Sequence, residues 1–392
     1  MRGPLLIVTA GFPPSAAGGS SILNRNLWSE WPADDLVVVA RRAKATAENP
    51  ALALPNVKVH WIESWPLEGQ WESMLDPWAA FMVARKVIEI ARQVRPRALW
   101  ASWPPTSFML GAWIATSRLN LPFYIHLHDM WQQAACGKPR LFLERITAFA
   151  LERRVLSGAR RLFTITDAAA SHFRERLGLE SYVLDHAVPQ ADLDNASVAL
   201  SPVEQPLIHF AGHIYGVMNL DAMQNLAQAL PICRSATSLE CFTQNGPEAL
   251  RQIGLAGSRI VARFGSKAEV MAAQRRAAIV FLPLAFRSNC HIEVQTVFPT
   301  KLLEYFVCGR PILVHAPADT WVSQQARAHG WAEVVSEPSP QSLAAAIDSL
   351  LGSPQLQARL VAAARATAQR RAAPAIAAAL RAELERLENE RM

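Results

Sequence analysis

The chain has few of the features that mark secreted or membrane-spanning proteins. Only five of its 392 residues are cysteines, an odd number, and no two of them form a CxxC pair. A disulfide framework and a zinc knuckle are therefore poorly supported. No stretch reaches about 18 uninterrupted apolar residues, so we expect no membrane span. The short apolar run at 5–10 leads straight into a Gly/Pro loop, unlike a signal peptide, and we expect a cytoplasmic protein.

Motifs that define several large enzyme classes are also missing. There is no GxSxG and no GxxxxGK[ST], which excludes an α/β-hydrolase triad and a P-loop kinase. The glycine-rich loop at 11–21 is not GxGxxG, so a dinucleotide site is weakly supported. A DxD triplet, Asp192 to Asp194, lies in a polar run, and we expect no metal site there.

What is present is an alternation of apolar strands and helical segments along nearly the whole chain. A length of 392 residues suits two domains. Strands that are apolar throughout are typical of parallel sheets covered on both faces. We predict strands at 5–10, 35–40, 57–62, 98–103, 123–128, 161–166 and 182–187, and then at 207–212, 238–244, 259–265, 278–284, 310–316 and 332–337.

The alternation breaks once, in a polar run at 189–206 that contains three prolines. We interpret residues 191–206 of this run as a linker between an N-terminal Rossmann-like domain (1–190) and a C-terminal one (207–370). The fold class is therefore α/β, with two doubly wound domains that we expect to face each other across a cleft. The Ala-, Arg- and Leu-rich end, interrupted by Pro374, predicts a C-terminal helix at 371–392 that packs back across the domains.

The net charge of +6 is unevenly distributed. Residues 81–161 hold 13 lysines and arginines against four acidic residues. This excess indicates either solvated helix faces or a surface that meets anionic lipid, and peripheral contact with the inner face of the cell membrane is one expectation. No nucleic-acid motif accompanies the charge. The stretch 65–82 holds three tryptophans, which either belong to the core or form an apolar surface that contacts a lipid-linked or aromatic acceptor.

Ligands of doubly wound sheets bind beyond the carboxyl ends of the strands, so candidate site residues are sought there. Gly18 and Gly19 belong to the loop after the first strand and allow a ligand to approach the backbone at a helix N-terminus. His128 and Asp129 follow the fifth strand, where His128 is a candidate site residue and Asp129 is either a helix N-cap or an acceptor-side residue.

In the second half, residues 299–309 predict a helix that begins near a proline and ends at a glycine. Lys301 and Glu304 lie in its first turns. At a helix N-terminus these two side chains are suited to a phosphate and a sugar hydroxyl, respectively. An ordinary helix is an equally good explanation of this segment alone.

Taken together, these segments resemble the family-4 retaining glycosyltransferases of the GT-B fold. FAGHIY, FTQNGP, RFGSKAEV, AAIVFLPL and PTKLLEYFVCGRPIL occur in the family's order within residues 207–317, and the last is the most specific. The N-terminal half is similar more loosely, through its Gly-Gly loop and the His-Asp pair.

The resemblance implies a role for each matching residue. Glu304 would bind the ribose of a donor nucleotide, and His128 would contact the donor sugar. The remaining implied donor-side positions are the helix start at Lys301, Leu302 and Leu303, the phosphate loop at Gly18 and Gly19, and two segments beside the base at Gly246 and at Arg263–Lys267.

The sequence departs from the family pattern at two places. Thr296 stands where the family often has a first glutamate, with Glu293 nearby but out of register. His213 replaces the usual arginine, and a lysine expected a few residues later is missing. We expect Arg287, Lys301 and His213 to neutralise the leaving diphosphate instead.

The implied activity is transfer of a hexosyl group from a nucleotide sugar to a hydroxyl acceptor, which is either lipid-linked or a glycan. It uses no cofactor or metal. Two alternatives stay open: a non-catalytic or scaffolding relative, and a nucleotide-sugar 2-epimerase, which would need acid and base groups such as those at 126–129.

Overall fold

The computed structural model describes residues 3–14, 18–42, 52–63, 76–131, 142–196, 206–257 and 259–390. The chain forms two compact units. The first contains residues 1–187 together with 373–392, and the second contains residues 188–372. The predicted linker falls in the second unit, where its first residues belong to a short helix, α7 (Gln190–Asp194), and 197–205 lie outside the described residues.

The first unit is built on a seven-stranded parallel sheet in the order β3-β2-β1-β4-β5-β6-β7. All residues of β1, β4 and β5 are buried, as the continuous apolar runs predicted. The strands are β1 (Leu5–Thr9), β2 (Leu36–Arg41), β3 (Lys58–Ile62), β4 (Ala98–Trp103), β5 (Phe123–Leu127), β6 (Arg161–Thr164) and β7 (Ser181–Val183).

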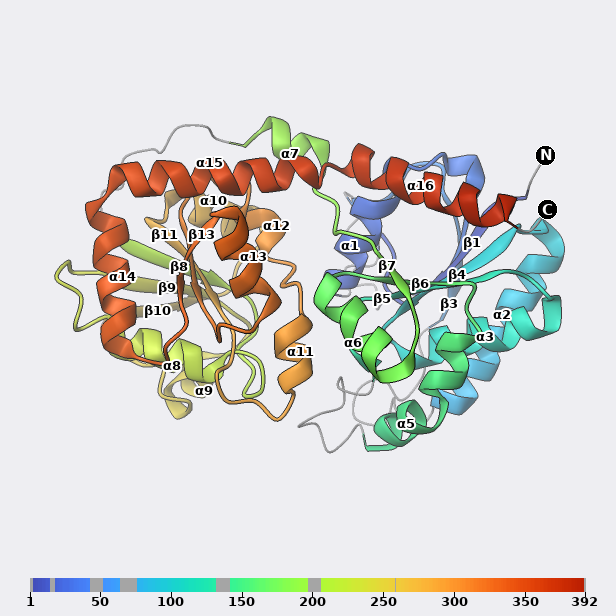
Figure 1. Ribbon diagram of the computed structural model, residues 1–392, viewed down its shortest axis with the longest axis horizontal. Helices are drawn as coiled ribbons and strands as arrows, with labels where there is room; N and C mark the ends of the chain where they lie inside the picture. The colour runs from blue at the N-terminus through green and yellow to red at the C-terminus, as the bar shows by residue number, and fades with distance from the viewer. Residues whose placement is uncertain are drawn as a thin grey trace. The chain divides into compact units, whose positions relative to one another are not determined.

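Helices cover both faces of this sheet (Figure 1). From β1 the chain adds β2 and β3 on one side of β1, and it then crosses over to add β4 to β7 on the other side. Right-handed crossovers therefore place α1 on one face of the sheet and α2, α3 and α5 on the opposite face. The helices are α1 (Gly18–Trp28), α2 (Asp76–Val94), α3 (Thr106–Leu119), α5 (Phe142–Ser157), α6 (Asp167–Leu177), the 3₁₀ helix η1 (Ala33–Asp35), and α16 (Ala373–Asn389).

The last helix, α16, belongs to the first unit although it follows the second unit in sequence. It packs beside α1 and is held by ion pairs from Arg97 to Glu388 (3.0 Å) and from Arg161 to Glu383 (2.9 Å). Pro374 is its second residue, where a missing N–H costs nothing. The predicted C-terminal helix that packs back is therefore confirmed.

The second unit has a six-stranded parallel sheet in the order β10-β9-β8-β11-β12-β13. The strands are β8 (Leu207–Ala211), β9 (Ser238–Phe242), β10 (Ile260–Arg263), β11 (Ile279–Pro283), β12 (Ile312–His315) and β13 (Ala332–Val335). The helices after α7 are α8 (Leu220–Ala229), α9 (Pro247–Gln252), α10 (Lys267–Arg276), α11 (His291–Thr296), α12 (Leu302–Tyr305), α13 (Trp321–His329), α14 (Pro340–Gly352) and α15 (Pro354–Arg370).

Both sheets reverse their strand order once, between β1 and β4 in the first unit and between β8 and β11 in the second. Such switch points are where doubly wound sheets bind ligands, beyond the carboxyl ends of the strands. The predicted fold class of two doubly wound Rossmann-like domains is confirmed. Among the described residues, no helix combines the length and apolar character needed to cross a bilayer.

Candidate functional site

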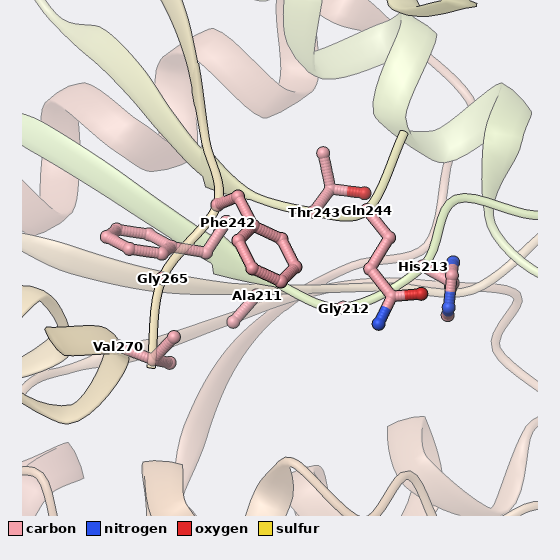
Figure 2. Close-up of a pocket in the computed structure, with 9 residues that line it drawn as sticks. Ala211, Gly212, His213, Phe242, Thr243, Gln244, Gly265 and Val270 are labelled. Atoms are coloured by element: carbon pink, nitrogen blue, oxygen red, sulfur yellow. The ribbon is translucent and has the colours of Figure 1, made fainter. Parts of the chain in front are cut away.

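A pocket of about 190 Å³ opens at the carboxyl ends of three neighbouring strands of the second unit, β8, β9 and β10 (Figure 2). Two phenylalanines contribute to it: Phe242 is buried, whereas Phe264 is 80% exposed. Exposed aromatic rings beside a pocket are suited to a planar ligand. The lining residues are Ala211, Gly212, His213, Phe242, Thr243, Gln244, Phe264, Gly265 and Val270.

Two glycines keep this pocket open. A Cβ atom at Gly265 would lie 2.8 Å from the Phe242 ring, so only glycine lets the chain pass so closely. Gly212 has a φ of 133°, which side chains rarely adopt, and a Cβ there would lie 3.1 Å from Nζ of Lys301. The backbone of the loop after β8 is therefore bare where a ligand would meet it.

Lys301 places an ammonium group beside this bare backbone. Its Nζ lies 4.1 Å from the centre of the Phe210 ring. Burial lowers the pKa of Lys301 to about 8, although Cys241 and Glu304 act in the opposite direction. No carboxylate among the described residues lies within ion-pair distance of it. A partly buried cation that lacks an acidic partner has the charge to hold an anion.

Glu304 lies one turn further along, in α12, and is half-buried. Its Oε2 accepts a hydrogen bond from Nε2 of the buried Gln274 (3.1 Å), and its Oε1 lies 3.8 Å from Nζ of Lys267. Lys267 and Gln274 both belong to α10, so the carboxylate joins α12 to the helix behind the pocket. The side chain of Glu304 is 26% exposed.

A second carboxylate, Glu240, organises the cations of β10 and α10. It is buried in β9 and pairs with Nε of Arg263 (2.7 Å) and Nη2 of Arg276 (3.1 Å). His209 on β8 lies 4.0 Å from it, and burial, followed by Arg276 and Lys301, lowers the pKa of His209 to about 4. Arg263, predicted to flank a base, is thus fixed by Glu240.

The loop after β8, which carries His213, is held by two asparagines. Asn219 accepts a hydrogen bond from the N–H of Tyr215 (2.9 Å) and donates one to the carbonyl of His213 (3.1 Å). Asn245 accepts one from the N–H of Ile214 (3.2 Å). The exposed His213 ring is therefore presented by a fixed backbone.

Asp221 connects this loop to the one after β11, across the switch point. Its carboxylate accepts hydrogen bonds from the N–H groups of Phe286 (3.1 Å) and Arg287 (2.8 Å). Ser288 donates a further bond to the carbonyl of Val217 (2.5 Å). The side chain of Arg287 is exposed, and in the described part of the chain it has no ion-pair partner.

The other predicted donor-side residues lie around this centre but do not line the pocket. Thr296 is buried and donates its hydroxyl hydrogen to the carbonyl of Ile292 (2.7 Å). Leu302 and Leu303 are buried in the core, and Gly246 is the exposed N-cap of α9. The predicted helix from residue 299 begins as turns, and its regular part is α12.

In the first unit, His128 lies in a cluster of three buried histidines. Its ring centre is 4.2 Å from that of His126 and 5.7 Å from that of His186, with which it stacks. Burial lowers the pKa of His128 to about 4 and that of His126 well below its ordinary value. Both nitrogens of His126 and His128 lack hydrogen-bond partners among the described residues. Asp129, the next residue, is half-buried.

One prediction about local structure was wrong. Gly18 and Gly19 were placed in the loop after β1, but they are the first two residues of α1. A helix tolerates glycine there because the first N–H groups have no partner within the helix. The end of β1 is instead fixed by Asn24, which donates hydrogen bonds to the Gly11 carbonyl (2.6 Å) and the Thr9 hydroxyl (3.3 Å).

Several residues of the site were not singled out by the sequence. Phe242 and Gln244 lie at the end of a strand predicted at 238–244 and could have been found by the strand-end rule. Asn219 and Asp221 carried no such signal, because their role depends on contacts between loops that are distant in sequence. In the described residues, no group of three or more His, Cys, Asp or Glu side chains is arranged to hold a metal ion.

Known protein families match both halves of the chain. Residues 18–184 match the family described as glycosyl transferase 4-like domain, and residues 205–353 match glycosyl transferases group 1. A comparison with curated protein sequences found no match.

Solved structures resemble the chain over almost its full length. Anabaena HepE in complex with UDP and glucose has 16% identity and a TM-score of 0.67, covering 98% of this chain and 100% of that one. A sucrose-phosphate synthase from Thermosynechococcus elongatus has 15% identity and a TM-score of 0.72, covering 99% and 100%. A Listeria monocytogenes protein assigned as a UDP-N-acetylglucosamine 2-epimerase has 14% identity and a TM-score of 0.62, covering 100% and 98%.

Proposed function

We propose a specific reaction for this chain, which consists of glycosyltransferase domains with the GT-B fold. It transfers a hexosyl group from a nucleoside-diphosphate sugar to an acceptor hydroxyl group, with retention of configuration, in the synthesis of a glycan or glycoconjugate. The observation that carries the proposal is the ammonium group of Lys301 beside the bare backbone of Gly212, at the mouth of a pocket lined by aromatic rings.

We propose one orientation of the donor in this pocket. The base lies against Phe242 and Phe264, and Glu304 accepts hydrogen bonds from the ribose hydroxyl groups. The diphosphate then lies over Gly212, where the ammonium group of Lys301 faces it. Arg287, on the loop after β11, adds a second positive charge, and His213, on the loop after β8, lies at the same switch point.

Charge develops on the leaving diphosphate and on the sugar ring as the anomeric bond breaks. The charges of Lys301 and Arg287 stabilise the leaving phosphate, and Lys301, which lies against Phe210, needs little reorganisation during the reaction. His128 is proposed as the sugar contact because the family resemblance implies this role, and its imidazole is neutral because burial lowers its pKa to about 4. The departing phosphate takes the proton of the acceptor hydroxyl, which attacks from the same face. The scheme uses no metal and no cofactor.

We place the reaction in the cytoplasm, at the inner face of the cell membrane, with an acceptor that is either lipid-linked or a glycan. Asp129, half-buried after β5, is proposed to belong to the acceptor side in the first unit. UDP is the first nucleotide to test, because HepE binds UDP.

The test is thermal unfolding with UDP, GDP, ADP and TDP. A ligand at a hundred times its dissociation constant stabilises a protein by about 2.7 kcal/mol. We expect one nucleotide to raise Tm in the wild type and in Glu248→Gln, an exposed control in α9, but not in Glu304→Ala or Phe264→Ala. The proposal fails if no nucleotide raises Tm, or if the site variants respond like the control.

Two alternatives make different predictions in the same experiments. A non-catalytic relative, suggested by Thr296 and His213, would bind the nucleotide but never release it from a donor sugar. A 2-epimerase would convert a UDP-sugar to its epimer at C2 without an acceptor. The Listeria protein shows that the fold also occurs in a chain assigned that activity. Chromatography of the nucleotide products distinguishes all three.

A further inference from the structure

Two helices of the first unit expose large apolar side chains. On α2, Trp78 is 48% exposed and Phe81 is 57% exposed. On α5, Ile146 is 49% exposed and Phe149 is 80% exposed. Within each helix the two residues are three positions apart, so they lie on one side. The opposite side of each helix is buried against the unit, and core packing therefore does not account for the exposure of Phe81, Ile146 and Phe149.

The same helices expose arginines. Arg85 and Arg92 lie on α2, and Arg145 and Arg153 lie on α5. Among the described residues, none of the four has a carboxylate partner. The exposed Glu89 on α2 is already paired with the neighbouring lysine at 3.0 Å. The exposed side of both helices is therefore apolar and cationic together.

The two helices belong to one layer. Between them lies α3, which meets α2 at Gly111 and meets α5 at Trp113, over whose ring the guanidinium of Arg154 lies at 5.8 Å. Each of these helices precedes a strand of the parallel sheet, so all run against the strands and begin at the carboxyl edge. The exposed apolar residues lie in the first half of each helix, toward that edge, and three of the four arginines lie behind them.

We propose that this α2–α5 surface, made of Trp78, Phe81, Ile146, Phe149 and the exposed arginines of both helices, binds a lipid bilayer with anionic headgroups. Aromatic and aliphatic side chains enter the boundary between headgroups and acyl chains, while guanidinium groups pair with lipid phosphates. A second copy of the chain is a poor partner, because its own arginines would face these arginines.

The surface also explains how a lipid-linked acceptor would reach the protein, a point that rests on the proposed function. The carboxyl edge toward which the apolar residues lie is also the edge at which β5 ends and His128 begins the following loop. A bilayer bound at the α2–α5 surface brings its lipids to the edge of the sheet where doubly wound units bind ligands.

Vesicle flotation tests the apolar part of the surface. We expect the wild type to float with vesicles of phosphatidylglycerol and phosphatidylcholine and not with phosphatidylcholine alone. Phe81→Ser with Phe149→Ser should lower the partition coefficient more than tenfold, because each phenylalanine loses apolar burial. Ile232→Ser, at an apolar residue of the second unit that is 46% exposed, is the control and should leave partitioning unchanged.

The charged part is tested by Arg85→Gln with Arg153→Gln, with exposed Arg234→Gln in the second unit as control. Each neutralised arginine should lower partitioning about fivefold, and added salt should abolish the difference. Circular dichroism melting and the nucleotide-induced rise in Tm should be unchanged in all these variants, because the substitutions lie on the surface. The flotation result can therefore be interpreted even if no nucleotide raises the Tm of the wild type.

Three results overturn the inference. The first is no flotation of the wild type at low salt. The second is equal binding to neutral and anionic vesicles, or equal losses in the control variants. The third is a stable dimer in sedimentation that Phe81→Ser with Phe149→Ser dissociates, which would assign the surface to self-association instead.

Discussion

Replacing Lys301 by methionine should stabilise the protein and abolish donor binding at the same time. Methionine has a similar length and keeps the side chain against Phe210, but it removes the buried charge. A residue that is retained despite a cost to stability is expected where a ligand uses its charge. The two effects have opposite signs, so a single variant separates the function of Lys301 from its contribution to folding.

The size of the stabilisation follows from the lowered pKa. Burial lowers the pKa of Lys301 from 10.5 to about 8, and each pKa unit corresponds to about 1.36 kcal/mol. The upper bound is therefore about 3 kcal/mol. The lost cation–π contact is worth about 0.5–2 kcal/mol, and a methionine sulfur near the ring returns about 0.3–1.5 kcal/mol. We expect a net gain of about 2 kcal/mol after these corrections.

Thermal unfolding measures this gain. For a unit of about 150–250 residues, 1 kcal/mol shifts Tm by about 2–4 °C, so Lys301→Met should raise the Tm of the second unit by about 4–8 °C at pH 7. Lys267→Met, an exposed control in the same unit, should shift stability by less than about 0.5 kcal/mol.

The pH dependence identifies the cause. Between pH 8 and 10.5 the folded protein loses the Lys301 proton while the unfolded chain keeps it, so the wild type gains stability as pH rises through this window. The advantage of Lys301→Met should shrink across it. A lower Tm for this variant at pH 7, or an undiminished nucleotide response, would refute the reasoning.

Three further outcomes are expected. Glu240→Gln should destabilise the second unit by about 1–3 kcal/mol in denaturant unfolding, because it leaves Arg263 and Arg276 without their carboxylate, and their partial exposure limits the loss. Asp221→Ala should cost about 1–2 kcal/mol and weaken nucleotide binding, because two N–H groups of the loop after β11 lose their acceptor; equal affinity in titration calorimetry would contradict this. Stability of the first unit should fall by about 1.4 kcal/mol per pH unit between 6.5 and 4 for His128 alone, since only the unfolded chain binds its proton there, and His128→Asn should flatten this slope.

The sheets were predictable because burial on both faces leaves a plain signal. A strand such as β4, whose residues are all buried, reads as an unbroken apolar run in the sequence. The predicted strand positions are confirmed in both sheets, and the ends differ by a few residues. Helix boundaries were less predictable: α1 begins at Gly18, before the apolar residues that suggested it, since glycine carries no positive signal for a helix start.

The site was predictable only in part, because it depends on which loops meet. The helix-start pattern selected Lys301 and Glu304, the family resemblance added Arg263, and the structure brings these near one pocket. It could not select Asn219, whose two hydrogen bonds fix the backbone around His213. Nor could it show that Phe264 would stay exposed beside the pocket, because an apolar residue in sequence predicts burial.

The departure at His213 has a physical explanation in the burial of Lys301. Two unit charges 4 Å apart attract by about 1 kcal/mol in water but by about 4 kcal/mol at an effective dielectric constant of about 20. In the proposed function, a single ammonium in a partly buried position, close to the bare backbone of Gly212, would therefore attract a diphosphate as strongly as several exposed cations. Arg263 contributes less, because Glu240 already neutralises it. Loss of the exposed arginine and lysine typical of the family is thus compatible with activity as long as Lys301 stays charged and without an acidic partner.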